Sequence, residues 1–224
     1  MHADREEFIR QELRTPGAAA IAGVVFSVLL GISLVLVRLA VPGDPSDARE
    51  WLANSERRHA VLVAVNLVPF AGIAFLWFIG VIRDRLGQRE DRFFATVFLG
   101  SGLVFVAMLF AASAVTVSLA TGFRGGVHSS ADSAQTWRFG GSLAHALLTT
   151  FGMRMAAVFM ISTATLTYRS GVVPRWLGLA GYACALALLV GVNAVGWLEL
   201  LFPLWVLLIS GYFLIENRRQ TPGP

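Results

Sequence analysis

The sequence predicts an all-α fold, a polytopic membrane helix bundle with six transmembrane helices and both termini in the cytoplasm. The chain is 56% hydrophobic and has a mean hydropathy of +0.67, far above an ordinary soluble domain. Six apolar stretches reach the length of about 20 residues that a helix needs to cross a hydrocarbon core. The arginines, which are the only basic residues besides histidine, concentrate at the ends of these stretches.

The six predicted spans follow one another along residues 18–215, between a tail of residues 1–17 and a tail of residues 216–224. The spans are Ala18–Val41, Ala60–Ile82, Phe93–Leu119, Leu143–Tyr168, Trp176–Val195 and Trp197–Ile215. The third and fourth are longer than a bilayer requires, which predicts tilt or protrusion. Only a tight turn around Asn193–Gly196 separates the last two, so these should form an antiparallel hairpin.

The orientation follows from the placement of arginines. Eleven lie in the two tails and in the loops after the second and fourth spans, against six on the opposite side. Such an excess marks the cytoplasmic face of an inner (plasma) membrane protein. Both tails are therefore predicted to be cytoplasmic, and the two longer loops, 42–59 and 122–142, should lie outside.

Two interpretations of these outer loops remain open. Asp47–Glu50 and Asp132–Gln135 both have the spacing of a helix capping box just before an aromatic residue. The first would begin a short interfacial helix. The second would begin a helix running into the fourth span, with Gly140-Gly141 as a flexible joint. In the other interpretation, both segments are ordinary loops anchored by aromatic side chains.

Small residues recur at every fourth position along the first span, at Ala19, Gly23, Ser27 and Gly31. This spacing allows two helix backbones to approach closely. The pattern is explained either by packing within one chain or by a homo-oligomer that uses the first helix as its interface.

Arg154 is the most informative residue because it stands at about the midpoint of the fourth apolar stretch. A guanidinium at that depth costs roughly 2.5–3.5 kcal/mol on translocon scales, so it should face protein or water rather than lipid. Thr150 and Thr165, at offsets of four and eleven residues, lie on the same helix face. Glu199 is the predicted counter-ion.

Two prolines add unpaired acceptors to the same half of the bundle. Pro69 and Pro203 lack N–H groups, which leaves the carbonyls of Val65 and Glu199 without their helix partners. The predicted ligand-binding residues are Arg154, Glu199, Asn66, Thr150 and Asn193.

Three functions fit this polar cluster. The leading hypothesis is non-enzymatic binding of a membrane lipid, a small anion or another membrane protein; the arginine would otherwise serve only to hold the helices in register. The second is a small transporter, because a cation near proline-broken helices is a common substrate site. The third is a haem or metal site at His59, His128 and His145. Because HExxH, CxxC and paired-carboxylate motifs are absent from the sequence, we predict no catalytic residue, metal or cofactor. We also predict no nucleic-acid partner, because the arginines behind the net charge of +4 concentrate at the ends of the spans.

Two stretches carry a family resemblance. The segment Val172–Gly178, which leads into the fifth span, resembles a recurring segment of small bacterial six-span membrane proteins of unknown function. The stretch Leu67–Gly87 is similar to uncharacterised membrane proteins of high-GC bacteria. The resemblance implies the six-span layout and carries no activity.

Overall fold

The computed structural model describes residues 16–40, 54–86, 92–122, 130–170 and 174–220, and these segments are helical and contain no strand. Their elements, in order, are α2 (Pro16–Ala40), α4 (Ser55–Leu86), α5 (Arg92–Gly122), α6 (Ser130–His145), the π-helix η4 (Ala146–Gly152), α7 (Met153–Ser170), α8 (Arg175–Gly191), the 3₁₀ helix η5 (Gly196–Leu200) and α9 (Leu201–Gln220). The predicted all-α class is confirmed.

Within the described residues, five helical stretches are long and apolar enough to cross a membrane: Ala20–Ala40, Ser55–Arg83, Ala95–Thr121, Gln135–Tyr168 and Gly196–Glu216. They identify the chain as a multi-pass membrane protein by length and composition. The fifth predicted span corresponds to α8, an apolar helix of 17 residues that is shorter than the others. A sixth crossing at α8 therefore stays a prediction.

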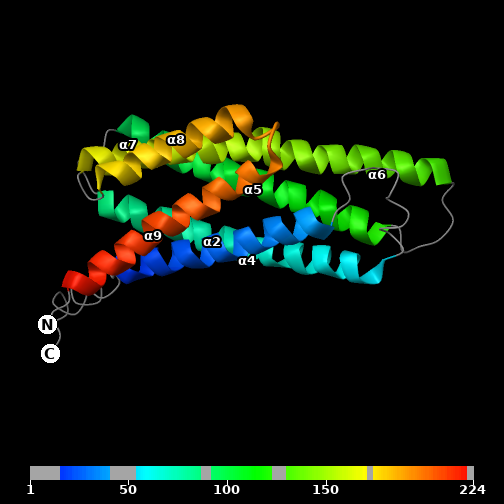
Figure 1. Cartoon of the computed structure of the whole chain (residues 1–224), viewed down its shortest axis with the longest axis horizontal. Helices are drawn as coiled ribbons and strands as arrows, with labels where there is room; N and C mark the ends of the chain where they lie inside the picture. Colours follow the sequence, from blue (N-terminus) through cyan, green and yellow to red (C-terminus); the bar gives the residue numbers. More distant parts are fainter. Residues whose placement is uncertain (1–15, 41–53, 87–91, 123–129, 171–173, 221–224) are drawn as a thin grey trace, which may run out of the picture.

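The helices run side by side along the long axis of the molecule (Figure 1). The first and last described residues, Pro16 and Gln220, lie at the same end, which we name the terminal end. The opposite, distal end holds the last turn of α2, the first turns of α4 and the last turns of α5. Helix α6 extends furthest in this direction, whereas the connection between α8 and α9 lies well short of it.

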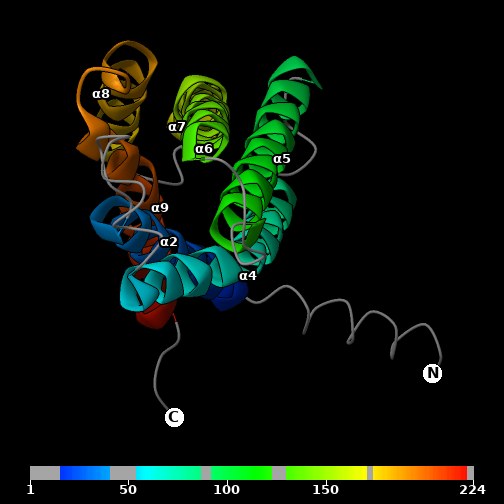
Figure 2. The same ribbon diagram turned by 90° about the vertical axis from the view of Figure 1, so that its right-hand side faces the viewer.

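The helices pack as a ring around an aromatic centre. Helix α2 lies between α4 and α9, α5 lies between α4 and α7, and α7 packs against α8. Figure 2, which looks along the bundle from the distal end, shows α8 at the edge of this arrangement. The centre is filled by five completely buried phenylalanines from five different elements: Phe26, Phe75, Phe105, Phe159 and Phe202.

The phenylalanine rings contact one another directly. Phe26 and Phe75 lie with their ring centroids 4.5 Å apart, Phe105 and Phe202 4.9 Å apart, and Phe75 and Phe159 5.0 Å apart. Such pairs gain about 0.5–1.5 kcal/mol each beyond the area they bury. The middle of the bundle is therefore a packed apolar block, to which α8 contributes no ring.

The outer surface of the bundle is also apolar. Large side chains are exposed on most sides, including Phe70 at 62%, Trp77 at 68% and Val190 at 78%. A chain that is apolar both inside and outside matches a lipid environment, where exposed hydrocarbon carries no cost.

Of the two interpretations of the segment before the fourth span, the structure shows the helix, which begins two residues before the proposed cap at Asp132, and the predicted joint within it is wrong. Helix α6 begins at Ser130 and continues without a break through η4 into α7. Gly140 lies inside α6, where a Cβ would come within 2.7 Å of Leu119 Cδ2 on α5, so this glycine provides a close approach between helices. The departure from α-helical geometry comes later, at η4. The predicted helix at Asp47–Glu50 lies outside the described residues, as do most of the two predicted tails.

The small-residue stripe on α2 is partly internal. Gly23 is buried, and a Cβ there would overlap Ser210 Oγ on α9 and approach Phe78 on α4 within 2.8 Å. Ser27 is also buried and donates a hydrogen bond to the Gly23 carbonyl at 2.7 Å. Gly31 faces open space. Packing within the chain thus explains the middle of the stripe; a homo-oligomer through its remainder stays a prediction.

Candidate functional site

The register between α7 and α8 is set by one hydrogen bond and one close approach. Thr165 Oγ1 and Tyr182 Oη lie 2.7 Å apart. One turn earlier on α8, a Cβ at Gly178 would lie 3.8 Å from Tyr168 Cβ on α7. The two helices run in opposite directions along the bundle (Figure 1).

This register places Arg154 level with the end of α8. Arg154 is eleven residues before Thr165, and Asn193 is eleven residues after Tyr182. At a rise of about 1.5 Å per residue, both positions lie about 16 Å further toward the distal end. Helix α8 ends at Gly191, so Asn193 belongs to the turn that follows it. The face of α7 that carries Thr165 also carries Arg154. Beyond this level the helix continues as η4 and α6, against which α8 does not pack.

Arg154 is partly buried and makes one hydrogen bond. Its Nη1 donates to the carbonyl oxygen of Thr150 at 2.6 Å, as the offset of four residues on one helix face allows. Among the described residues no carboxylate forms an ion pair with it. A guanidinium has five N–H donors, so the described residues leave most of its hydrogen-bonding capacity unused.

The π-helix η4 lies immediately before Arg154, and no pattern in the sequence predicts it. Its geometry is visible at Met153, whose N–H donates to the carbonyl of Leu148, five residues back. Thr149 Oγ1 donates to the carbonyl of His145 at 2.6 Å. A π-bulge turns the following residues relative to an uninterrupted α-helix, and such bulges occur frequently at functional sites. The bulge therefore affects the direction in which the Arg154 side chain projects from the helix.

Among the described residues Glu199 forms no ion pair, neither with Arg154 as predicted nor with another arginine. It is 8% exposed in η5, and the charged group that acts on it electrostatically is Arg38, at the distal end of α2. The Arg38 guanidinium lies 5.7 Å from the ring centroid of Trp197. A Cβ at Gly196 would overlap the same guanidinium, so the absence of a side chain there lets Arg38 approach η5.

The predicted pairing of Arg154 with Glu199 is therefore wrong. Helix α9 packs mainly against α2 and contacts α7 only slightly. Glu199 also stands in a 3₁₀ segment, with three residues per turn, which changes the direction of its side chain relative to an α-helix. Neither the packing of α9 against α2 nor the 3₁₀ geometry at Glu199 could be predicted from the sequence.

The remaining predicted site residues are divided between two places. Asn66 is exposed on α4 and its Nδ2 donates to the Leu62 carbonyl of its own helix at 2.7 Å. Asn193 is exposed in the turn after α8. The structure thus joins Thr150 to Arg154 and sets Asn193, in the turn after α8, at about the same level. Asn66 on α4 and Glu199 in η5 form no hydrogen bond or ion pair with Arg154.

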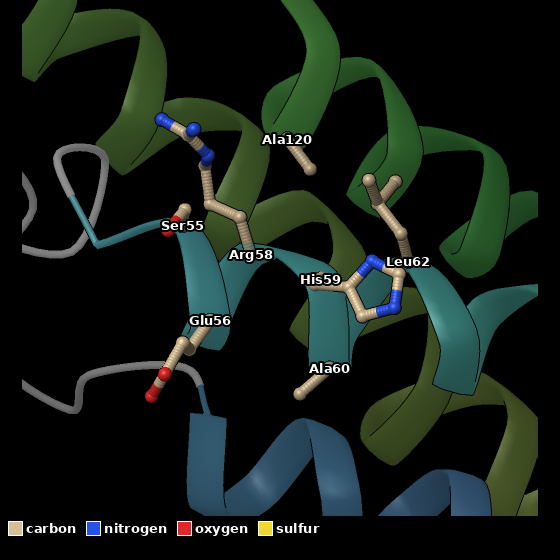
Figure 3. Close-up of a pocket in the computed structure, with 7 residues that line it drawn as sticks. All are labelled: Ser55, Glu56, Arg58, His59, Ala60, Leu62 and Ala120. Carbon is tan, nitrogen blue, oxygen red and sulfur yellow. The ribbon is translucent and has the colours of Figure 1, made fainter.

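A separate hollow of about 530 Å³ opens at the distal end between α4 and α5 (Figure 3). It is lined by Ser55, Glu56, Arg58, His59, Ala60, Leu62 and Ala120. The imidazole of His59 lies beside Leu62, while Glu56 and Arg58 point to opposite sides of the helix. Within the described segments, no group of three or more His, Cys, Asp or Glu residues could hold a metal ion.

Comparison with protein-family models, with curated proteins and with solved structures gives no match. The resemblance to six-span bacterial membrane proteins stays a prediction, and function has to be argued from Arg154 and its surroundings.

Proposed function

We propose that this chain is a non-enzymatic, multi-pass protein of the plasma membrane that binds an anionic group at Arg154, with its terminal end in the cytoplasm. The observation that carries the proposal is an arginine within an apolar, membrane-length helix that has one carbonyl as its hydrogen-bond partner. Ionisable residues at such places are rare and are kept for a function or for a partner.

The orientation rests on the arginines of the described helices. Seven stand at the terminal end, at positions 83, 85, 92, 169, 175, 218 and 219, and four at the distal end, at positions 38, 57, 58 and 138. An excess of arginine next to the spans favours the cytoplasmic side. Arg154 would then lie in the half of the membrane nearer the outside.

The chemistry of the free donors favours an oxyanion. A guanidinium is planar, remains charged, and matches the geometry of carboxylate and phosphate oxygens better than an ammonium does. Its cost in an apolar region falls when an anion neutralises it. Binding therefore explains the retention of an arginine that nothing in the described part of the chain neutralises.

The packed centre supports binding over transport. Five phenylalanines fill the middle of the ring of helices, and the Phe159 ring, five residues from Arg154, lies 5.0 Å from that of Phe75. A transporter would have to open this contact in each cycle, whereas a binding site at the edge of the bundle leaves it intact.

Native mass spectrometry of the purified protein tests the proposal. Wild-type protein is expected to retain an anionic ligand through gentle detergent extraction, and Arg154→Gln is expected to lose it. Arg57→Gln is the matched control, because Arg57 is an exposed arginine at the distal end of the bundle. Equal retention by wild type and Arg154→Gln would overturn the proposal.

A further inference from the structure

We infer that the anion is the phosphate of a membrane phospholipid, held between Arg154 and Asn193 at the point where α8 ends. This inference rests on the proposed function and adds to it the class of ligand, a second binding residue and the direction of entry.

Arg154 and Asn193 stand at about the same level along the bundle. The hydrogen bond between Thr165 and Tyr182 fixes α7 against α8, and equal helical rise carries both helices to Arg154 and Asn193. Because Arg154 stands on the face of α7 that meets α8, it is directed toward the space beyond the last residue of α8. The connection between α8 and α9 stops at this level and leaves α6, which lies further toward the distal end, uncovered on this side (Figure 1).

Both residues have free hydrogen-bonding capacity. In the turn after α8, the Gly191 carbonyl accepts from the N–H groups of Ala194 and Val195 at 2.9 and 3.0 Å. These bonds occupy backbone groups of the turn and leave the exposed Asn193 amide available to a ligand. The guanidinium likewise uses one donor on Thr150.

The net charge at the site is positive. The C-terminal end of a helix carries roughly half a negative charge, which alone would disfavour an anion beside α8. The full positive charge of Arg154 exceeds it, so the site as a whole attracts an oxyanion. A phosphate diester can accept from the guanidinium fork and from the asparagine amide at the same time.

Apolar residues near Arg154 and Asn193 in the chain favour a lipid over a free anion. Large exposed apolar side chains stand close in sequence to the two binding residues. Phe151, three residues before Arg154, is 56% exposed, and Val190 and Val195, on either side of Asn193 in the chain, are 78% and 51% exposed. A lipid places its acyl chains against such surfaces and its phosphate at the arginine, whereas a free anion would leave them uncovered. Entry is then sideways from the bilayer and needs no passage through the phenylalanine centre.

Defined probes added to delipidated protein test the inference. The probes are dioleoylphosphatidylglycerol, dioleoylglycerol without phosphate, and inorganic phosphate as a competitor, each measured by native mass spectrometry. We expect the phospholipid to bind, the diacylglycerol to bind at least tenfold more weakly, and millimolar phosphate to leave the bound lipid in place. Arg154→Gln and Asn193→Ala should each weaken phospholipid binding about tenfold, as loss of a hydrogen bond to a charged group implies, and Arg57→Gln should not.

The outcomes separate this inference from the proposed function. If phosphate binds alone, or displaces the lipid, in an Arg154-dependent way, the lipid assignment is overturned and anion binding at Arg154 stands. If Asn193→Ala binds like wild type while Arg154→Gln does not, Asn193 is excluded from the site. If Arg154→Gln binds every probe like wild type, the proposed function fails as well.

Discussion

Arg38 and Arg154 are the same residue type in similar apolar helices, yet their surroundings differ. Arg38 lies over the Trp197 ring, against Gly196, and near the buried carboxylate of Glu199. Arg154 has the Thr150 carbonyl of its own helix. The first arginine has partners supplied by another helix, so its role is explained within the fold. Among the described residues the second has none of that kind, which is why we propose a partner from outside the chain.

Helices α2 and α8 are attached to the bundle in different ways. The Arg38 contact joins the distal end of α2 to η5, and the contact of Gly23 with Ser210 joins α2 to α9 nearer the terminal end. Helix α8 is attached to α7 through Tyr182 and to α9 through Gly181, on which the indole of Trp205 packs. The Trp205 Nε1 is buried there without a hydrogen-bond partner. A helix held by so few polar contacts at the edge of the bundle provides a natural border for a lipid.

Removal of Arg38 should have the largest effect. Arg38→Ala leaves the Glu199 carboxylate buried without the cation that stabilises it and removes the contact with Trp197. We expect a loss of about 0.5–2 kcal/mol in the free energy of unfolding, the range for removal of a cation from the face of an aromatic ring. Equilibrium unfolding in mixed detergent micelles measures this value. Arg57→Ala, which removes an exposed arginine from the same end of the bundle, is the control and should change stability by less than about 0.5 kcal/mol.

A double-mutant cycle should sharpen the assignment of Glu199. Glu199→Gln removes the carboxylate charge, so it should recover part of the loss caused by Arg38→Ala, with a coupling energy of about 0.5–2 kcal/mol. The same cycle between Glu199→Gln and Arg154→Leu should give additive changes, because the structure sets these residues apart. Coupling to Arg154 instead of Arg38 would restore the pairing that the sequence suggested and contradict the structure.

Local patterns predicted most of the fold and one contact of the site. Apolar runs located the five membrane-length helices because hydrocarbon thickness demands such runs. Helical periodicity predicted that Thr150 and Arg154 share a face, and the structure adds a hydrogen bond of 2.6 Å from Arg154 Nη1 to the backbone carbonyl of Thr150. Both inferences depend on residues close together in the chain.

The errors concern long-range packing and local departures from α-helical geometry. The partner of Glu199 depends on α9 lying beside α2, which is decided by close approaches such as that at Gly23. The predicted flexible joint at Gly140 is wrong because Leu119 packs against this glycine and α6 continues through it. The π-helix before Arg154 has no residue signature, because threonine and leucine also fit an ordinary α-helix.

Replacement of Arg154 should have the smallest effect on stability. Its result distinguishes a binding role of this arginine from a structural role. Arg154→Leu removes a charge that is costly in an apolar region and one hydrogen bond to a carbonyl of its own helix. Because these terms oppose each other, we expect the free energy of unfolding of the delipidated protein to change by less than about 0.5 kcal/mol. Wild-type protein with phospholipid should be more stable than without it, since a ligand that binds the folded state stabilises it, and Arg154→Leu should show little of this gain. A loss comparable to that of Arg38→Ala in the absence of lipid would instead make Arg154 a structural residue and remove the contrast between the two arginines.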